Sequence, residues 1–183
     1  MATYVPTPLW ARPGGFRTLV RIILEQQVSL ASAASLFRRV DGELRGGWSP
    51  VAVSRAGEAG MRGHGLTRQK AAFVVALAER VGGEPQWFRR LARLDDADAF
   101  AALTSLHGIG PWTASIYLLM VLRRPDVWPP GDLALHKAIG ALPDQHRTPS
   151  TQEATAIAER WAPHRATAAR ILWHGYLRQK ADG

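Results

Sequence analysis

A glycine-rich turn between two apolar stretches constrains the fold of this chain more than any other feature of its sequence. Gly108 and Gly110 flank an isoleucine, and Pro111 follows directly. Glycine adopts backbone conformations that other residues resist and lets another molecule approach the main chain closely, whereas proline suits the first position of a helix. We therefore expect one helix to end before Gly108 and another to begin at Pro111, where unpaired amides and the helix dipole favour an anion.

The apolar residues of the rest of the chain recur at helical spacing, and no stretch alternates in the manner of a strand. Residues 1–15 are rich in proline and glycine and predict an extended arm, and the glycines of residues 57–65 predict a loop. The pattern as a whole predicts an all-α fold. Helices are expected at about 16–27, 30–40, 68–81, 86–93, 95–106, 111–122, 132–141, 151–161 and 164–179. A further short helix is expected to begin at 49–50.

The charge of the chain indicates a polyanionic partner. Its 183 residues carry a formal net charge of +8, which attracts nucleic acid first of all, although simple solubility explains such a charge as well. The chain has no cysteine, which excludes disulfides and any cysteine-ligated zinc or iron–sulfur site. No apolar stretch is long enough to span a bilayer, and the N-terminus lacks the pattern of a secretory signal. We therefore expect an intracellular, cytoplasmic protein that is associated with the nucleoid and not with membranes.

Four stretches in a fixed order resemble the helix-hairpin-helix (HhH-GPD) superfamily of DNA glycosylases, and within it 3-methyladenine DNA glycosylase II, the alkylated-base branch. They are LVRIILEQQVSLASAA at 19–34, GLTRQKAAFVVALA at 65–78, LTSLHGIGPWTASIYLL at 103–119 with Asp132 beyond it, and WAPHRATAARILW at 161–173. The resemblance implies a single domain with a two-lobed helical fold and an active-site cleft between the lobes. One lobe would contain residues of about 17–124 with the hairpin at 103–119, and the other about 1–16 plus 125–183.

Asp132 is the residue to which the resemblance assigns catalysis. Cleaving an N-glycosidic bond builds positive charge on the sugar, as in glycoside hydrolysis. A carboxylate that faces the sugar stabilises this charge and orients or deprotonates water. The residue also suits a structural role, because Gly131 and Asp132 precede a helical stretch and aspartate is a frequent N-cap. The two roles are compatible.

Aromatic residues are implied to grip the base that such an enzyme takes out of the duplex. Trp112 stands where related enzymes that also cut the DNA backbone carry a lysine, so the resemblance implies a monofunctional enzyme that uses water. Trp112, Trp173 and Tyr117 are expected to line the base pocket, where electron-rich rings favour a cationic alkylated purine. Packing in the core is the alternative for the two tryptophans. Gln27 occupies the family's wedge position, which fills the gap left by the extruded base, and a solvated helix end is its alternative.

Main-chain groups of the hairpin are expected to hold a DNA phosphate without reading the base sequence. The residues involved are Gly108, Ile109, Gly110 and Thr113. The carbonyl oxygens of Thr104, Leu106 and Ile109 correspond to the family's site for a monovalent cation, and no other cofactor is expected. Further phosphate contacts are expected from Arg62, Arg68 and Lys70. The alternatives are Arg123, Arg124, Arg165 and Arg170.

The function implied by the resemblance is hydrolysis of the N-glycosidic bond of alkylated purines, such as 3-methyladenine and 7-methylguanine, in base excision repair. The partner would be double-stranded DNA that contains damaged bases, and the protein would act as a monomer. Two alternatives stay open. One is a glycosylase for deaminated, etheno or oxidised bases, with Lys137 as a substitute amine for lyase activity. The other is a module that binds damaged DNA without cutting it, which would keep the hairpin but would not need Asp132.

Overall fold

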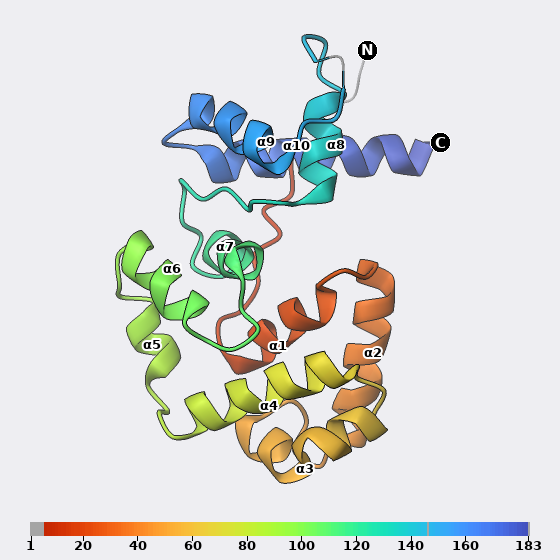
Figure 1. Ribbon diagram of the computed structural model, residues 1–183, viewed down its shortest axis with the longest axis vertical. Helices are drawn as coiled ribbons and strands as arrows, with labels where there is room; N and C mark the ends of the chain where they lie inside the picture. Colours follow the sequence, from red (N-terminus) through yellow and green to blue (C-terminus); the bar gives the residue numbers. More distant parts are fainter. Residues whose placement is uncertain (1–5, 146, 183) are drawn as a thin grey trace. The chain divides into compact units, whose positions relative to one another are not determined.

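Regular structure in the computed structural model is helical throughout the described residues, 6–145 and 147–182, and the all-α prediction is confirmed (Figure 1). The helices are α1 (Phe16–Glu25), α2 (Leu30–Glu43), α3 (Pro50–Gly63), α4 (Arg68–Gly82), α5 (Trp87–Leu91), α6 (Asp96–Thr104), α7 (Pro111–Met120), α8 (Leu133–Gly140), α9 (Thr151–Ala158), the 3-10 turn η1 (Glu159–Trp161) and α10 (Arg165–Asp182). Within these residues no helix is both long and apolar enough to cross a membrane.

Helix α3 occupies most of the stretch that its glycine content predicts to be a loop. Gly57 adopts φ +62° and ψ −178°, a conformation that interrupts the helical path and is readily accessible to glycine. The helix resumes beyond Gly57, where Met61 is fully buried and anchors the second segment in the core. The prediction of a loop over 57–65 was therefore wrong up to Gly63, because burial of an apolar side chain outweighs the low helix propensity of glycine.

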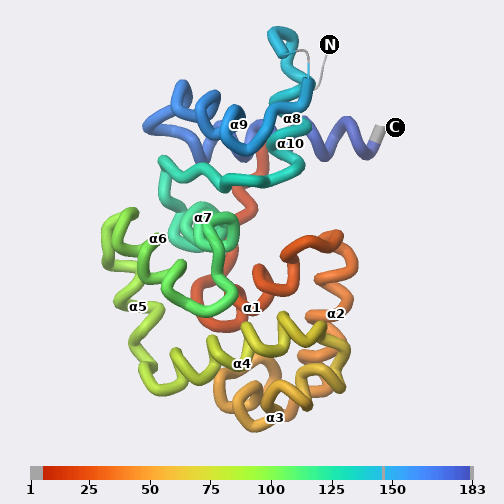
Figure 2. The backbone as a smooth tube through the Cα atoms, viewed as in Figure 1, coloured from red at the N-terminus to blue at the C-terminus, as the bar shows by residue number. Residues whose placement is uncertain are grey.

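Residues 12–117 form one of two compact units, and α1 is its central helix. Helix α1 packs against α2 and α4, and α3 packs against α4 (Figure 2). Most of α1 is buried, with Leu19, Ile22 and Ile23 fully so, whereas Arg17 and Arg21 keep one side exposed. The apolar side chains of α1 therefore form part of the core of this unit. Helix α4 begins at Arg68 as predicted, and Thr67 is its N-cap, because the Thr67 hydroxyl accepts a hydrogen bond from the Lys70 amide at 3.2 Å.

The second unit combines the N-terminal arm, described from residue 6, with residues 118–182. Within it α10 packs against α8, and α8 packs against α9. Arg170 of α10 holds the arm, because its buried guanidinium donates hydrogen bonds to the carbonyl oxygens of Leu9 at 3.0 Å and Leu119 at 2.7 Å. This burial lowers the pKa of Arg170. The alternative that Arg170 contacts a DNA phosphate was therefore wrong, because its guanidinium is buried and bonded to main-chain carbonyls. The active-site cleft that the resemblance implies stays a prediction.

Candidate functional site

The glycine-rich turn joins α6 to α7 as the sequence predicts. Helix α6 ends at Thr104 and α7 begins at Pro111. Between them the Ile109 amide donates to the Leu106 carbonyl at 3.1 Å, and Gly108 adopts φ +82°. The side chains of Leu106 and Ile109 are buried. The turn is thus anchored from inside by apolar side chains, and its main chain lies at the surface.

The two glycines of the turn are needed for different reasons. A Cβ atom on Gly108 would lie 2.1 Å from Cγ of Phe73, whose ring packs against the turn. The Phe73 ring also meets the His107 ring edge to face, with the ring centroids 5.0 Å apart. A Cβ atom on Gly110 would meet no atom within 4 Å, and this residue is exposed. The protein itself therefore requires glycine at 108. At 110 the absence of a side chain leaves the main chain open to an approaching molecule.

The other residues predicted to hold a phosphate can do so only through their main chain. The side chain of Ile109 is buried, and Thr113 is only 2% exposed. The Thr113 hydroxyl accepts a hydrogen bond from the side-chain amide of Gln26 at 2.9 Å. An anion at this turn would accordingly be bound by amides, as at other helix N-termini. The carbonyl set predicted to hold a monovalent cation suits such an ion chemically, and the Leu106 carbonyl already accepts the Ile109 amide.

The predicted wedge residue, Gln27, lies in the short turn that leads from α1 into α2. We call residues 26–29 the wedge turn (Figure 2). Gln27 is exposed and adopts φ +56°, a left-handed conformation that costs a residue other than glycine about 1–2 kcal/mol. Its neighbour Gln26 donates from Nε2 both to Thr113 and to the Gly108 carbonyl at 3.0 Å. The wedge turn is therefore bonded directly to the glycine-rich turn.

Lys70 does not project into solvent as a phosphate contact would. Its Nζ donates to the carbonyl oxygens of Leu24 at 2.8 Å and Gln26 at 3.0 Å, at the C-terminal end of α1. Partial burial lowers the pKa of Lys70. Arg62 and Arg68, by contrast, are exposed, and neither forms an ion pair within the described residues. They stay candidates for contacts to DNA.

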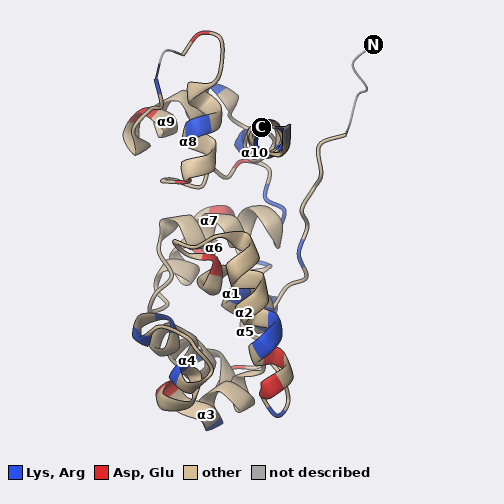
Figure 3. Cartoon of the chain, turned by 90° about the vertical axis from the view of Figure 1, so that its right-hand side faces the viewer, with Lys and Arg blue, Asp and Glu red and all other residues tan. Residues whose placement is uncertain are grey.

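Within each unit, lysine and arginine residues occur on several helices and are not confined to one of them (Figure 3). Several of them are neutralised, as Arg165 is by Asp126 at 2.7 Å and by Glu159 at 2.6 Å. The Arg165 guanidinium keeps the pKa of Asp126 below its usual range. Net charge alone therefore does not locate the surface that binds DNA.

Asp132 is both half-buried and held in place. It is the N-cap of α8, and its Oδ1 accepts hydrogen bonds from the Leu135 amide at 3.0 Å and from Nε1 of Trp173 at 3.1 Å. The expected N-cap role is confirmed. Because the Trp173 bond comes from another helix of the same unit, the carboxylate is oriented by two elements, and such orientation is what a catalytic carboxylate requires.

Trp173 itself belongs to a small aromatic cluster that also includes Trp10 of the N-terminal arm. The two rings meet edge to face, with centroids 6.2 Å apart, and Trp173 is 8% exposed. Trp10 adopts φ +47° and follows Leu9, whose carbonyl is bound by Arg170. The contact between Trp10 and Trp173 could not be predicted from the sequence. No local pattern indicates it, because the two tryptophans are far apart in the sequence.

Tyr117 and Trp112 differ in what they offer to a base. Tyr117 is 1% exposed, its hydroxyl accepts a hydrogen bond from the Gly15 amide at 3.0 Å, and its ring packs on Phe88. Burial raises the pKa of Tyr117 to about 12. The ring has no exposed face on which a base could stack, so Tyr117 is not part of the proposed base pocket. Trp112 is half-buried in the first turn of α7, and its place in a base pocket stays a prediction.

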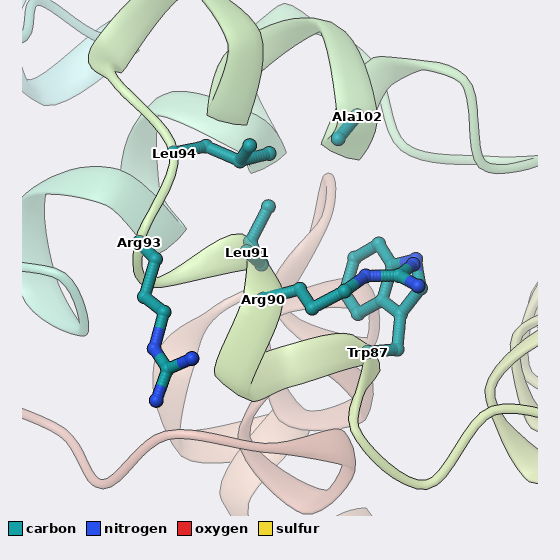
Figure 4. Close-up of a pocket in the computed structure, with 6 residues that line it drawn as sticks. All are labelled: Trp87, Arg90, Leu91, Arg93, Leu94 and Ala102. Atoms are coloured by element: carbon teal, nitrogen blue, oxygen red, sulfur yellow. The ribbon is translucent and has the colours of Figure 1, made fainter.

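A cavity of about 390 Å³ lies elsewhere in the unit of residues 12–117. Figure 4 shows its lining, which combines the side chains of Trp87, Leu91, Leu94 and Ala102 with those of Arg90 and Arg93. Its lining contains no carboxylate and no hydroxyl group. It therefore offers no group for hydrolytic chemistry, unlike the surroundings of Asp132. Among the described residues no three metal-ligating side chains come together.

Comparison with known proteins connects these features to one family. The sequence matches the HhH-GPD superfamily of base excision DNA repair proteins over residues 20–164. A putative DNA-3-methyladenine glycosylase of Bacillus subtilis is 25% identical over 174 residues, which cover 91% of this chain and 61% of that protein. DNA-3-methyladenine glycosylase 1 of Schizosaccharomyces pombe is 26% identical, with 94% of this chain and 77% of that protein covered. The chain thus spans less than two thirds of the length of the Bacillus relative.

The solved structures agree with this assignment of the fold. A 3-methyladenine DNA glycosylase of Schizosaccharomyces pombe, in complex with abasic DNA, superposes on this chain with a TM-score of 0.81 and 25% sequence identity. The match covers 94% of this chain and 85% of that chain. The helical architecture is therefore shared over nearly the whole of the sequence.

Proposed function

The chain belongs to the HhH-GPD superfamily of base excision DNA repair proteins, and we propose that it is a monofunctional DNA glycosylase that releases alkylated purines from double-stranded DNA. The substrates proposed are purines of the 3-methyladenine and 7-methylguanine type. Relatives named as DNA-3-methyladenine glycosylases support this substrate class. The relative solved in complex with abasic DNA supports DNA as the partner.

The observation that carries the proposal is the environment of Asp132. An aspartate that serves only as an N-cap needs one hydrogen bond from the helix that it begins. Asp132 receives that bond from Leu135 and a second from the indole of Trp173. Two bonds to Oδ1, which come from two different helices, fix the orientation of the carboxylate.

In the proposed reaction the damaged nucleotide is turned out of the duplex, and its glycosidic bond breaks as positive charge develops on the sugar. The Asp132 carboxylate stabilises this charge and accepts a proton from the water that adds to the sugar carbon. The purine leaves with the electron pair of the broken bond. Alkylation already gives the purine a positive charge, so its departure does not require a strong general acid.

Water is the proposed nucleophile because of the residue at position 112. A glycosylase with lyase activity attacks the sugar with an amine and forms a Schiff base. Trp112 has no such amine, and its indole is proposed instead to stack on the cationic base. The main chain at Gly110 is proposed to bind a phosphate, and the carbonyls of Thr104, Leu106 and Ile109 to hold a monovalent cation beside it.

The test uses duplex DNA treated with a methylating agent, with free purines and strand breaks measured separately. We expect release of methylated purines and strand breaks only after treatment with alkali, because hydrolysis leaves an intact backbone at the abasic site. Strand breaks before alkali would instead show lyase activity, and Lys137→Ala would then test the exposed lysine of α8. If no base were released from methylated, deaminated, etheno-adducted or oxidised DNA, the remaining hypothesis would be a module that binds damaged DNA without cutting it.

The hydrogen bond from Trp173 to Asp132 predicts the effect of Trp173→Phe. Phenylalanine keeps an aromatic ring at the position but cannot donate to Oδ1, so the carboxylate is less firmly oriented. We expect the rate of base release to fall by about tenfold, since misplacement of a catalytic group lowers the rate steeply. Single-turnover rates on methylated duplex DNA measure the effect.

Trp161→Phe is the matched control, because Trp161 lies in the same unit and its ring packs against that of Trp128, with the ring centroids 5.6 Å apart. We expect this variant to keep the wild-type rate. Equal losses in the two variants would mean that removal of any tryptophan from this unit impairs the enzyme, and the positioning role of Trp173 would be refuted.

A further inference from the structure

The wedge turn is held in a conformation that its own sequence does not favour. Gln27 adopts φ +56° and is exposed, and a residue other than glycine keeps such a conformation only where its surroundings impose it. Strained residues of this kind gather at functional sites. The groups that impose the conformation on Gln27 therefore need an explanation of their own.

Lys70 fixes the wedge turn on the side of α1. Its ammonium group donates to the carbonyl oxygens of Leu24 and Gln26 at the C-terminal end of α1, where carbonyl groups lack partners within the helix. A cation at this end is also favoured by the helix dipole. On the other side Ser29 caps α2, with its hydroxyl accepting the Ser32 amide at 3.2 Å. Only Gln27 and Val28 lie between these two fixed points.

Gln26 links the same turn to the glycine-rich turn. Its side-chain amide has two N–H donors, and its Nε2 bonds both the Gly108 carbonyl at 3.0 Å and the Thr113 hydroxyl at 2.9 Å. Gly108 lies in the glycine-rich turn, and Thr113 lies in the first turn of α7. A movement of the glycine-rich turn is therefore transmitted to Gln27 through a single side chain.

We propose that Gln26 and Lys70 are positioning residues that hold Gln27 as a preformed wedge and couple it to the phosphate-binding turn. The inference rests on the proposed function. A base leaves the stack only at a cost of unstacking and unpairing, and a wedge that is already in position fills the vacancy without further ordering. When the main chain near Gly110 binds a phosphate, the bonds of Gln26 then set where Gln27 enters the duplex. Val28 and Leu30, which are 46% and 60% exposed, place apolar surface beside it.

A purely structural role for the two residues predicts a different result from a positioning role. Loss of general stability would slow the release of a base from any DNA. Loss of the wedge would matter only in a duplex, where the base must be unpaired from its partner and the vacancy filled. Single-stranded DNA that contains the same lesion therefore serves as the internal reference.

The experiment compares Gln26→Met and Lys70→Met with Gln27→Ala, which removes the wedge itself. Methionine keeps the length of each side chain and removes its donors. Gln69→Met is the matched control, because Gln69 is exposed on α4 next to Lys70 and takes no part in these bonds. For the first three variants we expect the rate of base release to fall by about tenfold on duplex DNA and by less than about twofold on single-stranded DNA. A tenfold loss corresponds to a modest fraction of the free-energy cost of flipping a base. Lys70→Arg should recover part of the loss.

A second measurement does not depend on catalysis. The fluorescence of 2-aminopurine placed opposite a stable abasic analogue rises when a wedge disturbs the stack. We expect the rise with the wild-type protein and Gln69→Met, and a smaller rise with the other variants at saturating protein. Equal losses on both forms of DNA, or an unchanged fluorescence response in Gln26→Met and Lys70→Met, would overturn the inference. A wild-type protein that gives the fluorescence response but releases no base would refute the proposed function and leave the wedge intact, whereas no response from the wild-type protein would refute the wedge.

Discussion

We expect Asp132→Asn to lower the proposed rate of base release by roughly three orders of magnitude, because the variant lacks the negative charge that would stabilise the sugar cation and accept the proton of water. The rate is measured in single turnovers on duplex DNA with one defined alkylated purine. Affinity for abasic DNA, measured by fluorescence anisotropy, is expected to change by less than about threefold, since the groups proposed to bind phosphate lie in the glycine-rich turn. The loss should therefore appear in the chemical step.

Asparagine is the informative replacement because of what Asp132 does in the fold. Its Oδ1 can still accept from the Leu135 amide and from Trp173, and asparagine is as good an N-cap as aspartate. The free energy of unfolding of Asp132→Asn should thus stay within about 0.5 kcal/mol of the wild-type value. Asp132→Ala, which also removes the cap, should lose about 1 kcal/mol. Urea unfolding followed by circular dichroism distinguishes the two variants.

Two outcomes would contradict the assignment of Asp132. Base release that survives in Asp132→Asn would show that another group stabilises the developing charge. Equal loss of activity and of stability in the asparagine and alanine variants would show that the residue matters only as the cap of α8. In either case the catalytic carboxylate would have to be sought elsewhere.

Gly108→Ala should lower the free energy of unfolding by about 3 kcal/mol, the largest loss of stability that we predict for a single methyl group. The new Cβ would lie 2.1 Å from the Phe73 ring, so the ring or the turn has to move, and overpacking of this kind costs roughly 1–3 kcal/mol. The left-handed conformation at φ +82° adds about 1–2 kcal/mol when glycine is replaced. Urea unfolding of the purified variant measures the effect.

Gly110→Ala is the matched control two residues away. Its Cβ meets no atom of the protein within 4 Å, so we expect its stability to stay within about 0.5 kcal/mol of the wild-type value. Its affinity for duplex DNA should nevertheless fall, because the methyl group keeps a phosphate from the main chain. Unchanged affinity in Gly110→Ala would remove the glycine-rich turn as the phosphate site. Unchanged stability in Gly108→Ala would show that Phe73 repacks without cost.

Local features of the site could be predicted from the sequence because their cause is local. Pro111 begins α7, Thr67 caps α4 and Asp132 caps α8, each as expected from the preference of that residue type for that position. The turn at Gly108 follows from the freedom of glycine in the same way. Where the sequence was misread, over residues 57–63, the burial of Met61 decided the outcome, and burial is not a local property.

The helical class, the glycine-rich turn and the N-cap position of Asp132 could be read from the sequence, because each depends on residues that are neighbours in the chain. The bonds that hold the wedge turn became visible only in the folded protein. From sequence alone Lys70 was expected to contact a phosphate, yet it donates to carbonyl oxygens 46 and 44 positions away. Gln26 likewise donates to groups 82 and 87 positions away. The physical reason is that a buried donor must find an acceptor, and the folding of distant segments onto one another determines which acceptor is within reach.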